Sequence, residues 1–277
     1  MLVAAAVCPC PPLLVPEVAT GAAPELAAAR AACTDVVGLL AAARPDRLYV
    51  VGPADEGAHG VFPAGSTGSF AGFGVDLSVR LGDSVPPGAG SATTGAGSAT
   101  GGGGSATADG GTAAPGGAPA AGGEHRPAAD RPLPASLAVA AWLLGRAAWA
   151  DAPIEGLGVD PTATPDVCAG IGRGLADSAE RVALLVMGDG SACRTVKAPG
   201  YLDERAAGFD AEAARALGAA DAAALLALEP ELAYELKAAG RAPWQVLAGA
   251  AQGADLEGRL LFEDAPYGVG YFVAAWS

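Results

Sequence analysis

The chain has 277 residues, with 30 acidic against 16 basic side chains and a formal net charge of −14. Such an acidic protein cannot neutralise a phosphate backbone, so nucleic acid and anionic membrane surfaces are not expected partners. The cysteines are odd in number and scattered, with neither C-x2-C pairs nor a regular disulfide framework, which favours the reducing cytoplasm. The five cysteines are Cys8, Cys10, Cys33, Cys168 and Cys193.

The chain opens on an apolar stretch, residues 2–7, that we predict to be a buried strand. It is similar to the apolar part of a signal peptide, but no basic residue lies near it and prolines follow at once, so we do not expect a signal peptide. A helix is predicted over residues 23–43, a second strand over 46–54 and a strand-like alternation over 68–81. No apolar run reaches the roughly 20 residues that a membrane helix needs.

From about residue 86 to 132 the sequence consists mainly of Gly, Ala, Ser, Thr and Pro. This composition cannot bury enough apolar surface to offset its ordering entropy, so we expect disorder. The segment fits either a linker between two domains or a long insertion in a surface loop, which costs little loop-closure entropy. Because neither flank is expected to fold alone, we predict a single domain over residues 1–277 that this insertion interrupts.

The rest of the chain again alternates helices and strands. The strand predicted over residues 181–189 is apolar on both faces, which is typical of a sheet that helices cover on both sides. We therefore predict an α/β fold with a central sheet flanked by helices. The other elements expected here are helices over residues 133–150, 166–180, 210–228, 230–240 and 242–252 and strands over residues 257–266 and 268–276.

Three predicted strands run into turns rich in proline, glycine or polar residues. The turns are "CPCPP" at residues 8–12, "GPAD" at residues 52–55 and "GDGSACR" at residues 188–194. In open α/β sheets, ligands bind at the carboxyl ends of the strands. We therefore expect the functional site at these three turns.

The same turns carry a resemblance to a known family. "CPCPPLLVPEV" (residues 8–18) resembles a strand followed by Pro-His-Pro-Pro, "YVVGPAD" (49–55) a strand ending in Ser-Pro-His, and "VMGDGSACR" (186–194) the motif Ser-Gly-Asp-Leu-Ser-His. "GSFAGFGVDL" (68–77) is similar to a Phe-Gly turn and "EDAPYGVGYFVAAW" (263–276) to a terminal Pro-Phe-Gly-Val-Gly-Tyr strand. In order and spacing, these motifs resemble the class III extradiol ring-cleavage dioxygenases, of the catalytic B-subunit type of protocatechuate 4,5-dioxygenase, and the related Memo-like proteins.

The resemblance implies an oxidoreductase with a non-haem Fe(II) centre that opens catechol-like aromatic rings with O2. Two histidines and a carboxylate would hold the metal and leave positions open for substrate and oxygen, and a third histidine would act as acid and base. In this sequence, however, the two histidine ligand positions are occupied by Cys10 and Ala54, and the acid–base position by Ala192. Alanine offers no lone pair, so the resemblance implies that the standard site is missing.

The fourth element of the family site, a Glu or His before a helix, falls near Ala239 or Gly240, with Glu235 as the nearest carboxylate. The chain has only two histidines, and His125 lies within the glycine-rich insertion, which leaves His59. We carry two hypotheses. One is a dioxygenase-like enzyme with an altered metal site, and the other is a catalytically silent binding or interaction protein, a pseudoenzyme on the same scaffold.

Polar side chains remain in the expected pocket. The candidates are Asp189, Ser191, Cys193, Arg194 and His59. With Lys197 and Tyr201, the turn after the third strand could hold an anionic small molecule through its backbone N–H groups. On the other interpretation its polar groups satisfy turn amides and its basic groups are solvated. A small aromatic ligand is the alternative that the resemblance implies.

Cysteines cluster at the same turns. Cys8, Cys10 and Cys193 could form a thiolate site for zinc or copper, but small, inert core cysteines are the interpretation we favour. Members of the resembling family often dimerise, so the resemblance also raises homo-oligomerisation.

Overall fold

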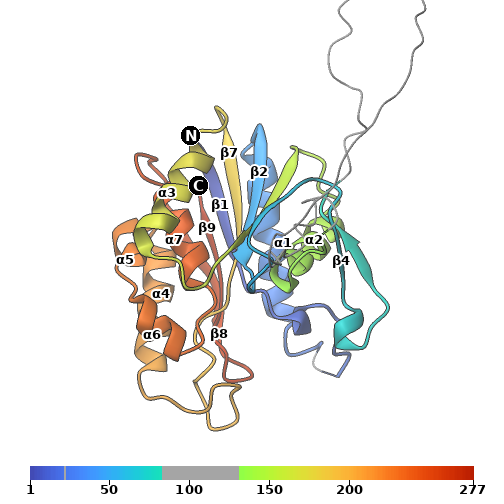
Figure 1. Ribbon diagram of the computed structural model, residues 1–277, viewed down its shortest axis with the longest axis vertical. Helices are drawn as coiled ribbons and strands as arrows, with labels where there is room; N and C mark the ends of the chain where they lie inside the picture. Colours follow the sequence, from blue (N-terminus) through green and yellow to red (C-terminus); the bar gives the residue numbers. More distant parts are fainter. Residues whose placement is uncertain (22, 83–130) are drawn as a thin grey trace, which may run out of the picture. The chain divides into compact units, whose positions relative to one another are not determined.

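The computed structural model describes residues 1–21, 23–82 and 131–277. The insertion predicted at about residues 86–132 therefore lies outside the described residues, apart from its last two positions. All described residues belong to one compact unit built on a seven-stranded sheet (Figure 1). The strand order of this sheet is β3-β6-β2-β7-β1-β9-β8, and a separate two-stranded sheet pairs β4 with β5.

The middle of the large sheet is parallel. Strand β2 pairs with β6 and β7, and β1 pairs with β7. Strands β9, β8 and β3 extend the sheet in antiparallel pairs. The strands are β1 (Leu2–Cys8), β2 (Arg47–Pro53), β3 (Gly60–Phe62), β4 (Thr67–Ser69), β5 (Ser78–Arg80), β6 (Ile154–Val159), β7 (Val182–Met187), β8 (Gly258–Asp264) and β9 (Tyr271–Trp276).

Each face of the sheet has its own hydrophobic core. Successive strand residues point to opposite faces, so Leu184 of β7 packs into one core and Leu185 into the other. Both side chains are fully buried. This two-sided burial is the reason why the central strands are apolar at nearly every position.

Helices cover both faces. Helices α1 and α2 cover one face, and α3 to α7 cover the other (Figure 1). Side chains from each group contribute to the core on their own face. The predicted α/β class is confirmed. The helices are α1 (Ala27–Ala42), α2 (Ala135–Arg146), α3 (Pro165–Ala176), α4 (Ala206–Gly218), α5 (Ala222–Leu226), α6 (Pro230–Glu235) and α7 (Arg241–Ala250), with 3-10 turns η1 (Pro12–Leu14) and η2 (Ala71–Phe73). Within the described ranges, no helix has the length and apolar character needed to cross a membrane.

Strand β6 is absent from the sequence prediction. Its two glycines, Gly156 and Gly158, resemble turn residues when the sequence is considered alone. In the structure they allow close packing, because a Cβ on Gly158 would lie 2.5 Å from the carbonyl oxygen of Ala58. A Cβ on Gly156 would lie 2.8 Å from Leu81. The two glycines thus mark close contacts on a strand in the interior of the sheet, between β3 and β2.

Two predicted elements are divided in the structure. The alternation over residues 68–81 becomes β4, η2 and β5, with Gly74 in the left-handed region at a φ of 83°. The helix predicted over residues 210–228 breaks at Ala220, which has a φ of 50°, and restarts as α5 where the Asp221 side chain accepts a hydrogen bond from the Ala224 N–H. Gly218 at the end of α4 and the capping Asp221 are the local signals for this break.

Candidate functional site

The carboxyl ends of β1 and β7 meet in the middle of the sheet because these strands are parallel neighbours. Just beyond them, the backbone N–H of Cys10 donates a hydrogen bond to Oδ1 of Asp189 at 2.8 Å. The Asp189 carbonyl oxygen in turn accepts from the N–H of Gly240, at the start of α7. Asp189 therefore ties together the turn after β1, the turn after β7 and the beginning of α7.

Asp189 has an unusual environment for a carboxylate. Burial raises the pKa of Asp189 to about 7, and the Cys10 N–H is the group that favours its ionised form. The side chain is half-buried and forms no ion pair with any residue in the described part of the chain. A carboxyl group so poorly compensated, at the strand ends where α/β proteins bind ligands, is a candidate functional group.

Two weak acids lie beside this carboxyl group. Burial raises the pKa of the Tyr271 phenol, and the charges of Asp189 and Cys10 add to the effect. Burial, followed by the charge of Asp189, also raises the pKa of the Cys10 thiol well above its usual range. Both groups are thus held neutral, and the cluster contains hydroxyl and thiol groups without a cation.

A second carboxylate, Asp210 on α4, organises the rest of the turn after β7. It is fully buried and accepts hydrogen bonds from the Ser191 N–H at 2.7 Å and from the Ser191 hydroxyl at 2.8 Å. Arg194 donates a third, charge-assisted bond at 2.9 Å. Ser191 and Arg194, predicted as pocket residues, are therefore committed to this clamp. Lys197, predicted as an anion-binding residue, is exposed.

The sequence did not identify Asp210 or Tyr271 as site residues. Asp210 lies in an alanine-rich helix, 19 residues from Ser191, where no motif spacing links the two. Close contacts leave room only for glycine at two neighbouring positions, since a Cβ on Gly190 or Gly270 would lie within 2.8 Å of an Asp210 oxygen. These glycines were the only feature of the turn's sequence that indicated a close contact there.

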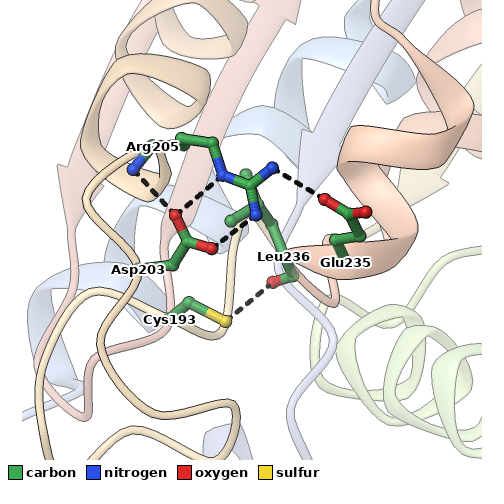
Figure 2. A network of polar contacts seen from close by, with 5 residues as sticks. All are labelled: Cys193, Asp203, Arg205, Glu235 and Leu236. Carbon is green, nitrogen blue, oxygen red and sulfur yellow. Dashed lines mark hydrogen bonds and ion pairs between the residues drawn. The ribbon is translucent and has the colours of Figure 1, made fainter.

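Cys193 is covered rather than exposed. Its thiol, 1% exposed, donates to the Leu236 carbonyl oxygen at 3.5 Å. Above it, Arg205 bridges Asp203 and Glu235, as Figure 2 shows. Burial is the main cause that raises the pKa of the Cys193 thiol. The residue is therefore an unreactive, packed thiol.

The structure separates the predicted cysteine cluster. Cys8 and Cys10 pack in the core beside α1 and α2, whereas Cys193 packs in the core on the other face of the sheet. A hydrogen bond with Cys33, followed by burial, raises the pKa of the Cys8 thiol. Across the described ranges, no three His, Cys, Asp or Glu side chains are grouped as a metal site would require. The preferred interpretation of inert core cysteines fits this arrangement.

His59 lies next to one of the positions that the family resemblance singles out. Its Nε2 is 2.9 Å from the carbonyl oxygen of Ala54, a hydrogen bond within the loop between β2 and β3. Arg131 donates to the His59 carbonyl oxygen at 2.9 Å. One ring nitrogen of His59 is thus held by a backbone carbonyl of its own loop.

The residues at the implied iron site do not fit Fe(II). Cys10, Ala54 and Ala192 are 7%, 4% and 8% exposed, and neither alanine has a donor atom. Glu235 is drawn to Arg205 at 2.7 Å on the exposed side of α6. The N–H of Gly240 is occupied by Asp189. The donor set of two imidazoles and a carboxylate is not assembled.

Comparison with protein-family models gives no match for this sequence, and curated proteins give none either. The resemblance to class III dioxygenases therefore rests on the sequence motifs and on their placement at the strand ends.

Proposed function

We propose that this chain is a class III extradiol dioxygenase-like protein that binds a small molecule at the carboxyl ends of β1 and β7 without an iron centre. The observation that carries the proposal is Asp189, a half-buried carboxyl group held by a single N–H from Cys10 and unaccompanied by any cation within the described residues. The acidic composition of the chain and its five free cysteines favour a cytoplasmic protein.

Iron-dependent ring opening is the other function that the resemblance implies. It requires imidazole ligands, and the positions in question carry Cys10, Ala54 and Ala192. A binding function needs none of them. We therefore prefer a pocket that has kept its place in the fold and has lost its metal chemistry.

The geometry favours a neutral aromatic ligand with hydroxyl groups over an anion. Arg194 is paired with Asp210, and no basic side chain of the described residues is among the causes that shift the pKa of Asp189. Asp189 can accept a hydrogen bond from a phenolic hydroxyl, and the Tyr271 hydroxyl beside it can exchange another. A catechol-type molecule matches this pair of oxygen groups.

Catechol titrated into the full-length protein, with a chelator present and observed by NMR, tests the proposal. We expect saturable shifts for the wild type and about tenfold weaker binding for Asp189→Asn, since a carboxylate is a stronger acceptor than an amide. Asp151→Asn, an exposed carboxylate before β6, serves as the matched control and should bind as the wild type does. Absence of binding, or equal weakening in both variants, would count against the proposal.

A second assay addresses the enzymatic alternative. The protein is loaded anaerobically with Fe(II), mixed with catechol and exposed to oxygen, and the absorbance of ring-opened product is followed. We expect no product above the rate of free iron, because no imidazole ligand is available. Product formed in proportion to protein-bound iron would show that the chain is an enzyme.

A further inference from the structure

A groove lies on the face covered by α3 to α7, between α6 and the loop that follows β6. Its volume is about 460 Å³, and it is lined by Thr162, Pro230, Glu231, Tyr234 and Glu235. A volume of this size is sufficient for a small organic molecule. No part of the Asp189 cluster contributes to its lining.

The wall opposite α6 is fixed in place. Thr162 donates from its N–H and from its hydroxyl to Oδ1 of Asp160, both at 2.7 Å. The residues on either side, Pro161 and Ala163, accept hydrogen bonds from the guanidinium of Arg241, which is 1% exposed. This loop is therefore pre-organised, which reduces the entropy that ligand binding would cost.

The α6 wall presents an aromatic ring. Tyr234 is 75% exposed, the most exposed of the large apolar side chains in the described ranges. An aromatic face that is open to solvent attracts cations, because the ring carries partial negative charge on its faces. Pro230 adds an apolar surface one helical turn earlier.

The charges of the lining are unbalanced. Its two ionisable carboxylates, Glu231 and Glu235, face no basic residue within the lining itself. Glu235 is paired with Arg205 at 2.7 Å, and Arg205 also binds Asp203, as seen in Figure 2. Glu231 forms no ion pair with the described residues. Glu231 is thus the lining carboxylate that has no basic partner in the described ranges, and it lies beside the exposed ring.

We propose that this groove binds a small, flat organic monocation, with the Tyr234 ring against its body and the Glu231 carboxylate as its counter-ion. The Thr162 oxygen can accept a further hydrogen bond from such a ligand. The alternative role of Glu231 is to stabilise the first turn of α6, where an acidic residue is favourable without any ligand. The two roles differ in what a neutral analogue of the ligand should do.

Benzamidine, an aromatic monocation, and benzamide, its neutral analogue of similar shape, are the probes. Each is titrated into the full-length protein by NMR or calorimetry. We expect benzamidine to bind at least about tenfold more tightly than benzamide, since the cation gains both the carboxylate and the ring. Equal affinities, or no benzamidine binding up to about 10 mM, would overturn the proposal.

Variants locate the site. Glu231→Gln and Tyr234→Ala should each weaken benzamidine binding about five- to tenfold, and Tyr234→Phe should retain it, because the ring is preserved. Glu180→Gln, an exposed carboxylate just before β7 at the other end of the strands, is the matched control. Asp189→Asn should also leave benzamidine affinity unchanged, which separates this groove from the proposed catechol site. A benzamidine affinity that Glu231→Gln does not alter would contradict the assignment.

Discussion

Asp189 and Asp210 are two carboxylates on either side of the same turn after β7, and their surroundings differ. Asp210 is fully buried and receives three hydrogen bonds, one of them from Arg194. Asp189 is half-buried and receives one, from the Cys10 N–H. A fully satisfied carboxylate stabilises the fold, whereas a poorly satisfied one costs stability and is a candidate for ligand binding. Asp210 therefore has a structural role, and Asp189 is the carboxylate that we propose to bind the ligand.

The largest effect is expected at Asp210. Asp210→Ala removes the acceptor for both Ser191 groups and leaves Arg194 without its partner, so we expect a loss of about 3–5 kcal/mol in the free energy of unfolding. Urea denaturation measures it. Glu212→Ala, on the same helix but exposed and paired only with Arg215, should leave the midpoint nearly unchanged. Similar midpoints for both variants would remove the distinction between the two carboxylates.

Asp189→Asn should raise the free energy of unfolding, whereas Asp210→Ala lowers it. The folded-state pKa of about 7 lies above the unfolded value near 4, so the folded protein binds this proton more tightly. Stability from this group is present at low pH, is lost as pH rises from about 4 to about 7, and stays lost above. The neutral amide avoids that loss. We expect the variant to be more stable than wild type by about 2 kcal/mol at pH 8.

The same variant supplies its own pH control. At pH 4.5 the wild-type carboxyl is protonated in the folded state, so the difference between Asp189→Asn and wild type should shrink to less than about half. Because other carboxyl groups titrate equally in both proteins, they cancel in the difference. A variant that is less stable than the wild type at pH 8 would mean that Asp189 is stabilised as an anion.

Cys10→Ala should have a smaller effect. Asp189 is held by the backbone N–H of residue 10, which alanine retains. The free energy of unfolding should therefore fall only by the packing of a buried thiol, about 1 kcal/mol. Chemical denaturation at pH 7 measures it. A loss as large as that of Asp210→Ala would indicate a role of the sulfur that the contacts do not show.

The smallest effect is expected at Arg205. Its ion pairs with Asp203 and Glu235 are solvent-exposed, so Arg205→Gln should shift the denaturation midpoint little, and less at high salt. Thermal denaturation at two salt concentrations checks this. A large shift would mean that the bridge in Figure 2 closes the loop over Cys193 more tightly than its exposure suggests.

Hydrophobic pattern predicted much of the fold. The strand over residues 181–189 was recognised because it is apolar at nearly every position, and β7 is covered on both faces as expected. Strand β6 was missed because Gly156 and Gly158 are chosen for contacts with distant residues, which local pattern cannot reveal. The break at Ala220 was missed because the alanine-rich composition outweighed two local signals, Gly218 at the end of α4 and the capping Asp221.

The sequence predicted where the site lies but not which of its residues are hydrogen-bonded to one another. The rule for carboxyl ends of strands led to the turns that contain Cys10 and Asp189, and these are hydrogen-bonded to one another. Which carboxylate partners Ser191 depends on how α4 returns to the sheet, and that contact joins residues 19 apart with no shared motif. Gly190 and Gly270 indicate a close contact at this turn, but only the folded structure shows that Asp210 makes it.

The most direct test of the account is the metal content of the full-length protein, purified anaerobically without a histidine tag and measured by elemental mass spectrometry. The account predicts less than about 0.1 equivalent of iron, zinc or copper, because the strand ends present Cys10, Ala54 and Ala192 where a metal centre would need imidazoles. About one equivalent of tightly held metal would contradict it. It would show that other residues of the chain assemble a metal site.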